Sequence, residues 1–286
     1  MGDWAFTFGH APIDAREVAR RIDGPLEEIG AAHALVESGG RWLLTVYATD
    51  ETRDAVAAAL TDAAPGARFE AERLPDENWV ARSLEGLAPV RAGRFLVHGA
   101  HDRHRVRHAD VAIEIEAGEA FGTGHHATTL GCLLAIERVL RTDRPRAILD
   151  LGTGSGVLAI ALAKRTGRAV LASDIDPVSV RTARANARLN GVGPLVRPFA
   201  ANGTDHPTIR GSAPFDLVVA NILAGPLRRM APGVAKVLAP RGTVILSGLL
   251  DRQTRGLRAR YREFGLAPRF AIRRDGWTTL ALQRGG

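Results

Sequence analysis

The chain has 286 residues, enough for two domains, and its 45% hydrophobic and 24% charged residues are typical of a globular protein. It contains no apolar run of about 18 residues, no basic-then-apolar leader and a single cysteine, Cys132, so we expect a cytoplasmic protein without a membrane span, secretory signal or internal disulfide. The net charge of +7 favours a nucleic-acid or ribonucleoprotein partner, although an arginine-rich composition alone would give the same charge.

The first 74 residues predict a small α+β domain. Alternating apolar residues predict strands, and helical spacing predicts helices, in the order strand 4–8, helix 12–22, strands 31–37 and 41–47, helix 50–60 and strand 67–73. This β-α-β-β-α-β order is that of a ferredoxin-like domain. Aromatic residues on the strands would also suit an RNA-binding platform, but no RNP1-like run is present, so core packing is the preferred interpretation.

Residues 75–100 are predicted to link this domain to a second one at 101–286, although residues 94–98 already read as a strand. Three histidines, His101, His104 and His108, lie in a basic stretch that we expect to be a loop. A loop supplies no defined ligand geometry, so we interpret this stretch as solvated and predict no metal.

Next comes a polar, glycine-containing stretch that includes Phe121, Gly122 and a threonine pair ending at Thr129, followed by a predicted helix at 130–140. It lies just upstream of the first strand of the second domain, so it can fold over a ligand bound there. The alternative is an ordinary N-cap, in which a threonine satisfies free helix N–H groups.

The most informative stretch runs from Ile148 into a predicted helix at 157–164. Between strand and helix stand Gly152, Gly154 and Gly156, which allow a tight turn and close approach of a ligand to the backbone. The free N–H groups of the helix would then face that ligand. A dinucleotide fingerprint would need a small residue at position 157, where Val157 stands, so a nicotinamide enzyme is disfavoured.

A second acidic group follows about 20 residues later, at the end of a predicted strand, where a ribose-binding carboxylate belongs. We assign the ribose hydroxyls to Asp174. We assign the N-cap of the helix that begins at Pro177 to Asp176, because an aspartate before a proline is a strong helix-start signal.

Strands and helices then alternate, and a hairpin around Asp275-Gly276 closes the pattern. The predicted elements are helix 177–190, strands 194–199 and 215–221, helix 226–238, strand 242–247, helix 251–264 and strands 267–273 and 277–283. This order predicts an α/β fold: a Rossmann-like, seven-stranded, mostly parallel sheet with one antiparallel strand.

The strand at 215–221 ends in Asn221, followed by Ile222, Leu223 and Ala224. The Asp150-x-Gly-x-Gly-x-Gly turn resembles motif I of class I methyltransferases, which hold the group to be methylated at the turn after this strand. The resemblance implies that an asparagine here can accept a hydrogen bond from an amine and orient its lone pair. Enzymes that methylate nucleic-acid bases commonly have prolines and a stacking aromatic at this turn. Their absence here favours an aliphatic amine, so Asn221 is the predicted catalytic residue.

Together these motifs resemble those of the PrmA family, the methyltransferases of bacterial ribosomal protein L11. The matching motifs are Ala120-Phe-Gly-Thr-Gly, Asp150-x-Gly-x-Gly-Ser-Gly, Asp174-Ile-Asp-Pro, Asn186-Ala-x-x-Asn-Gly and Asn221-Ile-Leu-Ala-Gly-Pro. The resemblance implies a class I methyltransferase domain that uses S-adenosylmethionine (SAM) and releases S-adenosylhomocysteine (SAH). It also implies an N-terminal domain that binds L11, and methylation of lysine side chains and the N-terminal α-amine.

The resemblance further implies that Thr129, Gly152, Asp174 and Asn221 contact SAM. We assign Gly154, Phe121 and Gly122 to the same cofactor site. The chain departs from the family at His125 and Ala127, where threonine and proline are usual, and at Glu119, where leucine is common. No general base is evident; His126 is a candidate by position, with a structural role preferred.

Three other functions stay open. The first is a lysine methyltransferase that acts on another protein, since the N-terminal domain matches by element order more than by residues. The second is an RNA or DNA methyltransferase, which the positive charge favours and the missing stacking aromatic opposes. The third is a non-catalytic binding module. We expect L11 as the partner, free or before ribosome assembly, with no direct nucleic-acid substrate, no membrane and a monomeric enzyme.

Overall fold

The computed structural model describes residues 3–8, 14–29, 31–38, 41–73, 89–115 and 126–285. The chain divides into two compact units, Met1–Trp79 and Val80–Gly286. The predicted linker at 75–100 overlaps the second unit, because residues 90–92 and 95–98 form strands there. The division into a domain, a linker and a second domain otherwise stays a prediction, since residues 74–88 lie outside the described residues.

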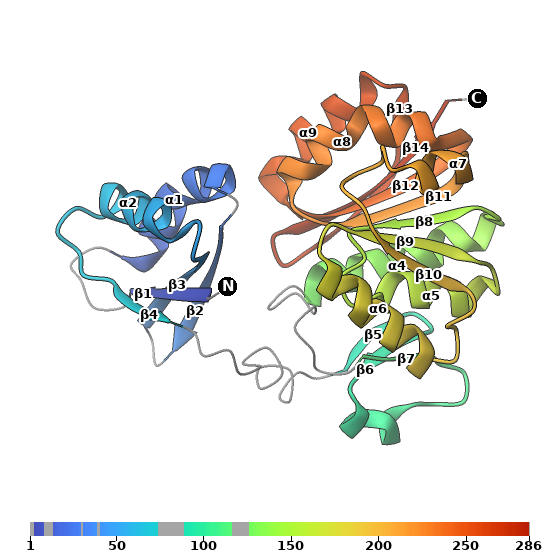
Figure 1. The fold of residues 1–286 in the computed structure, drawn as a ribbon, viewed down its shortest axis with the longest axis horizontal. Helices are drawn as coiled ribbons and strands as arrows, with labels where there is room; N and C mark the ends of the chain where they lie inside the picture. The colour runs from blue at the N-terminus through green and yellow to red at the C-terminus, as the bar shows by residue number, and fades with distance from the viewer. Residues whose placement is uncertain are drawn as a thin grey trace. The chain divides into compact units, whose positions relative to one another are not determined.

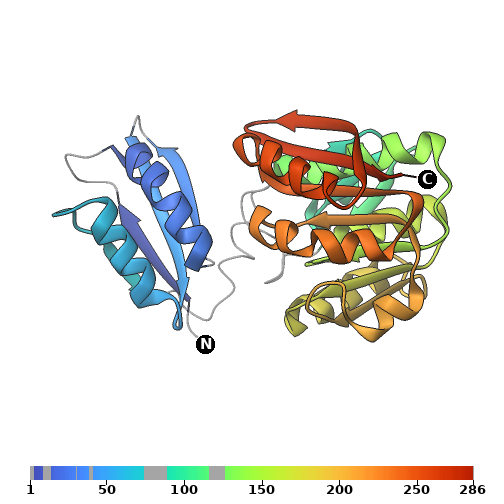
Figure 2. The same ribbon diagram turned by 90° about the horizontal axis from the view of Figure 1, so that it is seen from above.

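The first unit has the predicted ferredoxin-like order. Its elements are β1 (Asp3–Phe8), α1 (Ala15–Ile29), β2 (Ala32–Ser38), β3 (Arg41–Thr49), α2 (Arg53–Ala63) and β4 (Glu70–Arg73). The strands form one antiparallel sheet in the order β2-β3-β1-β4, and both helices lie on the same face of it (Figures 1 and 2).

Apolar side chains from the strands and both helices form the core of this unit, with Phe8, Ile22, Leu26 and Leu44 almost fully buried. Helix α1 runs beyond its predicted end at Ile22, through Gly24 and Pro25. Burial of Leu26 in the core explains the extension, because packing outweighs the weak helix propensity of those two residues.

The second unit begins with a small sheet made of β5 (Val90–Ala92), β6 (Phe95–His98) and β7 (Val111–Glu114). The three-histidine stretch expected to be a loop contains a 3-10 helix, η1 (Ala100–Arg105). In the described part of the chain, no group of three or more histidine, cysteine or acidic side chains is placed to hold a metal ion.

A seven-stranded sheet forms the body of the second unit, in the order β10-β9-β8-β11-β12-β14-β13. Its strands are β8 (Ile148–Leu151), β9 (Val170–Asp174), β10 (Val196–Ala200), β11 (Phe215–Asn221), β12 (Leu238–Leu250), β13 (Leu266–Arg274) and β14 (Trp277–Arg284). Neighbouring strands from β10 to β12 pair in parallel, and β14 pairs antiparallel with both β12 and β13. The predicted α/β class, with one antiparallel strand, is confirmed.

Helices cover both faces of this sheet (Figure 1). On one face lie α4 (His126–Thr142), α5 (Val157–Thr166) and α6 (Pro177–Leu189). On the other lie α7 (Pro207–Ser212), α8 (Ala224–Val237) and α9 (Thr254–Arg262), the last preceded by a 3-10 turn, η2 (Asp251–Gln253). The central strands are apolar almost throughout, as expected when both faces are buried.

Helix α6 begins as predicted. Asp176 is its N-cap, and the carboxylate accepts hydrogen bonds from the N–H groups of Val178 and Ser179, each at 2.9 Å. No helix in the described ranges is long and apolar enough to cross a membrane.

Candidate functional site

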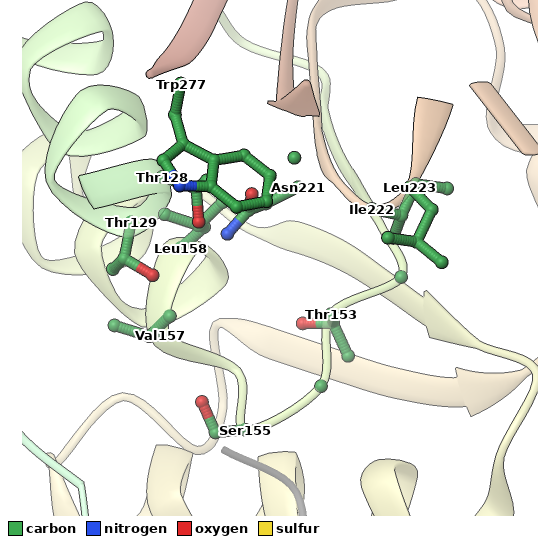
Figure 3. A pocket seen from close by; sticks show the side chains of 13 residues that line it. Thr128, Thr129, Thr153, Ser155, Val157, Leu158, Asn221, Ile222, Leu223 and Trp277 are labelled. Carbon is green, nitrogen blue, oxygen red and sulfur yellow. The ribbon is translucent and has the colours of Figure 1, made fainter. Parts of the chain in front are cut away.

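A pocket of about 210 Å³ opens at the carboxyl ends of the central strands (Figure 3). This is the edge at which open α/β sheets bind their ligands. Thirteen residues from the turns after β8 and β11, from α4 and α5, and from β12 and β14 line it: Thr128, Thr129, Gly152, Thr153, Gly154, Ser155, Val157, Leu158, Asn221, Ile222, Leu223, Gly248 and Trp277. None of these thirteen side chains is ionisable.

The glycine turn after β8 forms one wall. Gly152, Gly154 and Gly156 all have positive φ, at 70°, 53° and 84°, a backbone region that favours glycine. A Cβ on Gly152 would lie within 3.0 Å of the Ile222 side chain, so this turn packs directly against the turn after β11. The predicted role of these glycines in a tight strand-to-helix turn is confirmed.

Asp174, the last residue of β9, adjoins this wall. Its Oδ2 accepts a hydrogen bond from the Gly154 N–H at 2.8 Å, and its Oδ1 accepts one from the Asp176 N–H at 3.1 Å. Each oxygen keeps a lone pair for a further donor, because an ionised carboxylate accepts about four hydrogen bonds. The carboxylate is half-buried. The ribose role assigned to Asp174 stays a prediction.

Beneath the glycine turn lies Asp150, which is 1% exposed. Its Oδ2 accepts hydrogen bonds from the Thr153 hydroxyl at 2.7 Å and the Ala159 N–H at 3.1 Å. Its Oδ1 has no hydrogen-bond partner among the described residues. Burial raises the pKa of this carboxyl from 3.8 to about 7, and the nearby Asp174 charge acts in the same direction.

Asn221 ends β11, lines the pocket and pairs in register with Ser247 of β12. The next residue of β12, Gly248, has φ of 83°, and a Cβ there would lie within 3.0 Å of the Ile222 carbonyl. Only glycine therefore lets β12 pass this close to the turn. Leu223, the next residue after Ile222, also lines the pocket, and it is 49% exposed.

Helix α4 and strand β14 form the opposite wall, with Thr128, Thr129 and Trp277 (Figure 3). Ser247 ties the two elements together: its hydroxyl donates to the Thr128 carbonyl at 3.3 Å and lies 2.8 Å from the Thr279 hydroxyl. Thr128 and Thr129 are buried, at 2% and 7% exposure.

Of the predicted site residues, Thr129, Gly152, Gly154 and Asn221 line this one pocket. Phe121 and Gly122 lie outside the described residues, as does the side chain of His126, with which α4 begins. Their contribution to the site stays a prediction.

The sequence prediction missed Trp277, the aromatic in this pocket. The only local signal was its place after a hairpin turn. Strand order brings it to the site, because β14 inserts between β12 and β13. The sequence argument against a nucleic-acid base used only the Ile222-Leu223 turn, which lacks an aromatic. In the structure, β14 brings an aromatic side chain to the same pocket from elsewhere in the sheet.

Comparison with known proteins agrees with this arrangement. A protein-family model described as ribosomal protein L11 methyltransferase (PrmA) matches residues 28–285. A Rhizobium etli protein named ribosomal protein L11 methyltransferase is 52% identical over 247 residues, covering 85% of each chain. A Brucella suis protein of the same name is 49% identical over 240 residues, covering 84% of each chain.

Among solved structures, the chain is similar to the ribosomal protein L11 methylase from Lactobacillus delbrueckii subsp. bulgaricus. The sequence identity is 30% and the TM-score 0.63, and the match covers 70% of this chain and 100% of that one.

Proposed function

This chain belongs to the ribosomal protein L11 methyltransferase (PrmA) family, and on that premise we propose that it methylates nitrogen atoms of ribosomal protein L11, using SAM as the methyl donor. The proposed acceptors are lysine side chains and the N-terminal α-amine. We further propose that residues 1–74 recognise L11. The single observation that carries the proposal is that Asn221 lines the same pocket as the glycine turn after β8.

The residues present fit SAM. Three positive-φ glycines leave the backbone after β8 open to close approach. Helix α5 begins at this turn, where the Ala159 N–H donates to Asp150 and the first two residues, Val157 and Leu158, line the pocket. We assign the ribose hydroxyls to the Asp174 carboxylate and the backbone contacts to Gly152 and Gly154. Thr129, at the start of α4, supplies a hydroxyl on the opposite wall.

When bound, SAM supplies a methyl group already activated on a sulfonium. The protein then mainly has to align the acceptor and exclude water. We assign to the Asn221 side-chain oxygen a hydrogen bond from an amine N–H, which orients the nitrogen lone pair. Ile222, Leu223 and Leu158 contribute apolar surface to the same pocket.

The acceptor must be a neutral amine, but the described lining residues include no histidine, carboxylate or lysine to remove a proton. Desolvation lowers the pKa of an amine, because a poorly hydrated site disfavours the charged form. An α-amine, with an ordinary pKa near 8, needs a smaller lowering of its pKa to become neutral than a lysine side chain, with a pKa near 10.4. The proton therefore leaves to water before the amine is enclosed.

The test is methyl transfer from labelled SAM to a mixture of free ribosomal proteins, resolved by mass. We expect label on L11 alone, with several methyl groups added. Label on a different protein would replace L11 with another lysine substrate, and label in protein-free RNA would favour a nucleic-acid substrate.

The Asn221→Ala variant tests the site itself. We expect turnover to fall at least about 100-fold, the range seen when a group that aligns or stabilises the reacting centre is removed. The circular dichroism spectrum should stay that of the parent protein. Near-full activity in this variant would contradict the orienting role.

A further inference from the structure

One wall of the pocket carries an aromatic side chain, Trp277, that has no role in the mechanism proposed above. Trp277 is the first residue of β14, and its half-buried indole ring lines the pocket together with Asn221 and Thr128 (Figure 3). It is the one aromatic side chain among the described lining residues.

The backbone that carries this ring is firmly held. A tight turn precedes it, with positive φ at Asp275 (50°) and Gly276 (80°). The Gly276 carbonyl accepts a hydrogen bond from the Asp251 N–H at 2.9 Å, and the Thr278 hydroxyl donates to the Asp251 carboxylate. Trp277 itself pairs with Leu250 of β12. The ring is thus presented by a rigid element, as a binding surface requires.

The chemistry of the acceptor explains why a ring is useful there. In each methyl transfer the nitrogen lone pair forms the new N–C bond while the S–C bond breaks, and that electron pair stays on sulfur. The nitrogen becomes positive, and it releases a proton to water before another round. A trimethylated nitrogen has no N–H left, so it can no longer donate to the Asn221 oxygen.

The thirteen described lining residues carry no charged side chain that could pair with a positive nitrogen. The face of an indole ring attracts a cation without needing an N–H donor, and tryptophan does so best of the aromatic residues. An alkylammonium group is also bulky and apolar at its surface, which suits contact with a ring rather than with water.

We propose that Trp277 is the cation-binding wall of the amine site. Its ring face contacts the methyl groups as positive charge develops on nitrogen, which lets methylation continue to the quaternary stage. The inference rests on the proposed function, since it assumes an amine acceptor.

Choline and the uncharged alcohol in which carbon replaces its nitrogen test the ring directly, because the two have the same shape. With SAH present, calorimetry on the parent protein should show choline binding about tenfold more tightly than its carbon isostere. Trp277→Phe should keep part of this preference, and Trp277→Leu should abolish it. Equal preference in the parent and Trp277→Leu proteins would overturn the proposal.

The control is Phe264→Leu, because Phe264 contacts Arg260 outside the pocket and the variant should behave like the parent protein. SAH affinity within about twofold of the parent value confirms that each variant is folded. Should Trp277→Leu fail that check, parent protein made with ring-fluorinated tryptophan gives the answer, because fluorine weakens the ring face but keeps its shape. It should lose choline affinity and keep isostere affinity, and undiminished choline affinity would overturn the proposal.

Mass analysis of L11 methylated by each variant completes the test. Trp277→Leu should accumulate mono- and dimethylated sites, whereas the parent protein proceeds further. If the parent protein prefers choline but leaves L11 unmodified, L11 is not the substrate, and the proposed cation-binding role of Trp277 stands. Methyl label in protein-free RNA would assign the ring to base stacking and overturn the proposal.

Discussion

The buried Asp150 should make the stability of this protein fall as the pH rises toward neutrality. Its carboxyl is 1% exposed, and one oxygen has no partner among the described residues. Burial raises its pKa from 3.8 to about 7. The folded state therefore binds this proton more tightly than the unfolded state does, so the stabilisation is complete below pH ~4 and is lost as the pH rises through about 7.

The magnitude follows from the two pKa values. At 1.36 kcal/mol per pH unit, the difference between 3.8 and about 7 corresponds to about 4 kcal/mol in all. Roughly 3 kcal/mol of this should be lost between pH 5 and pH 8. The asparagine in Asp150→Asn cannot titrate, so the variant should not lose this free energy of unfolding. Its stability relative to the parent protein should therefore rise by the same amount between pH 5 and pH 8. The amide nitrogen it leaves buried carries a cost that does not depend on pH.

Urea unfolding followed by circular dichroism at a series of pH values measures this difference. Asp176→Asn is the matched control. Burial acts to raise the pKa of Asp176, but hydrogen bonds from Val178 and Ser179 have the larger effect, so the net pKa is lowered. The stabilisation by Asp176 is therefore present above its unfolded pKa and is lost only on acidification. Its effect should be constant from pH 5 to pH 8. A constant difference for Asp150→Asn as well would mean that the buried carboxyl is ionised throughout, and the reasoning would be refuted.

Three further substitutions probe the turn, the ribose site and the core. Gly152→Ala should cost more than about 1 kcal/mol in urea unfolding and weaken SAH binding, because its methyl group would crowd Ile222 at positive φ. Gly191→Ala, at the same φ of 70° in open space, should destabilise without changing SAH affinity, and equal calorimetric effects would contradict the crowding argument. Asp174→Ala should lower SAH affinity about tenfold or more, as expected for a hydrogen bond to a charged group, and unchanged affinity would remove it from the site. Tyr261→Phe loses a buried 3.0 Å hydrogen bond to a main-chain carbonyl of α8, so it should cost about 1 kcal/mol in urea unfolding while sparing SAH binding; an unchanged unfolding midpoint would contradict this.

Much of the site could be predicted because its signals are local. Three glycines between an apolar strand and an apolar helix indicate a tight turn, because glycine readily adopts the positive φ angles that such a turn needs. Asp176 before Pro177 marks a helix start by capping chemistry. Asn221 could be placed at the carboxyl edge because it ends a strand that is apolar on both faces.

Trp277 could not be predicted in this way, since no local pattern records which strands become neighbours. Its place depends on β14 lying next to β12, and on α4 packing closely against β14. That packing requires a glycine: a Cβ on Gly131 would lie within 3.0 Å of the Thr279 hydroxyl. Such a contact joins residues far apart in the chain and becomes visible only once both elements are placed.

The position of β14 also bears on how the protein is made. A ribosome releases the other six strands of the large sheet before residues 277–284, yet this strand lies between β12 and β13. A growing polypeptide therefore cannot join β13 to the sheet until the final strand emerges. The same strand carries the aromatic wall of the pocket, so a polypeptide truncated by a premature stop before it would lack both an intact sheet and a complete site.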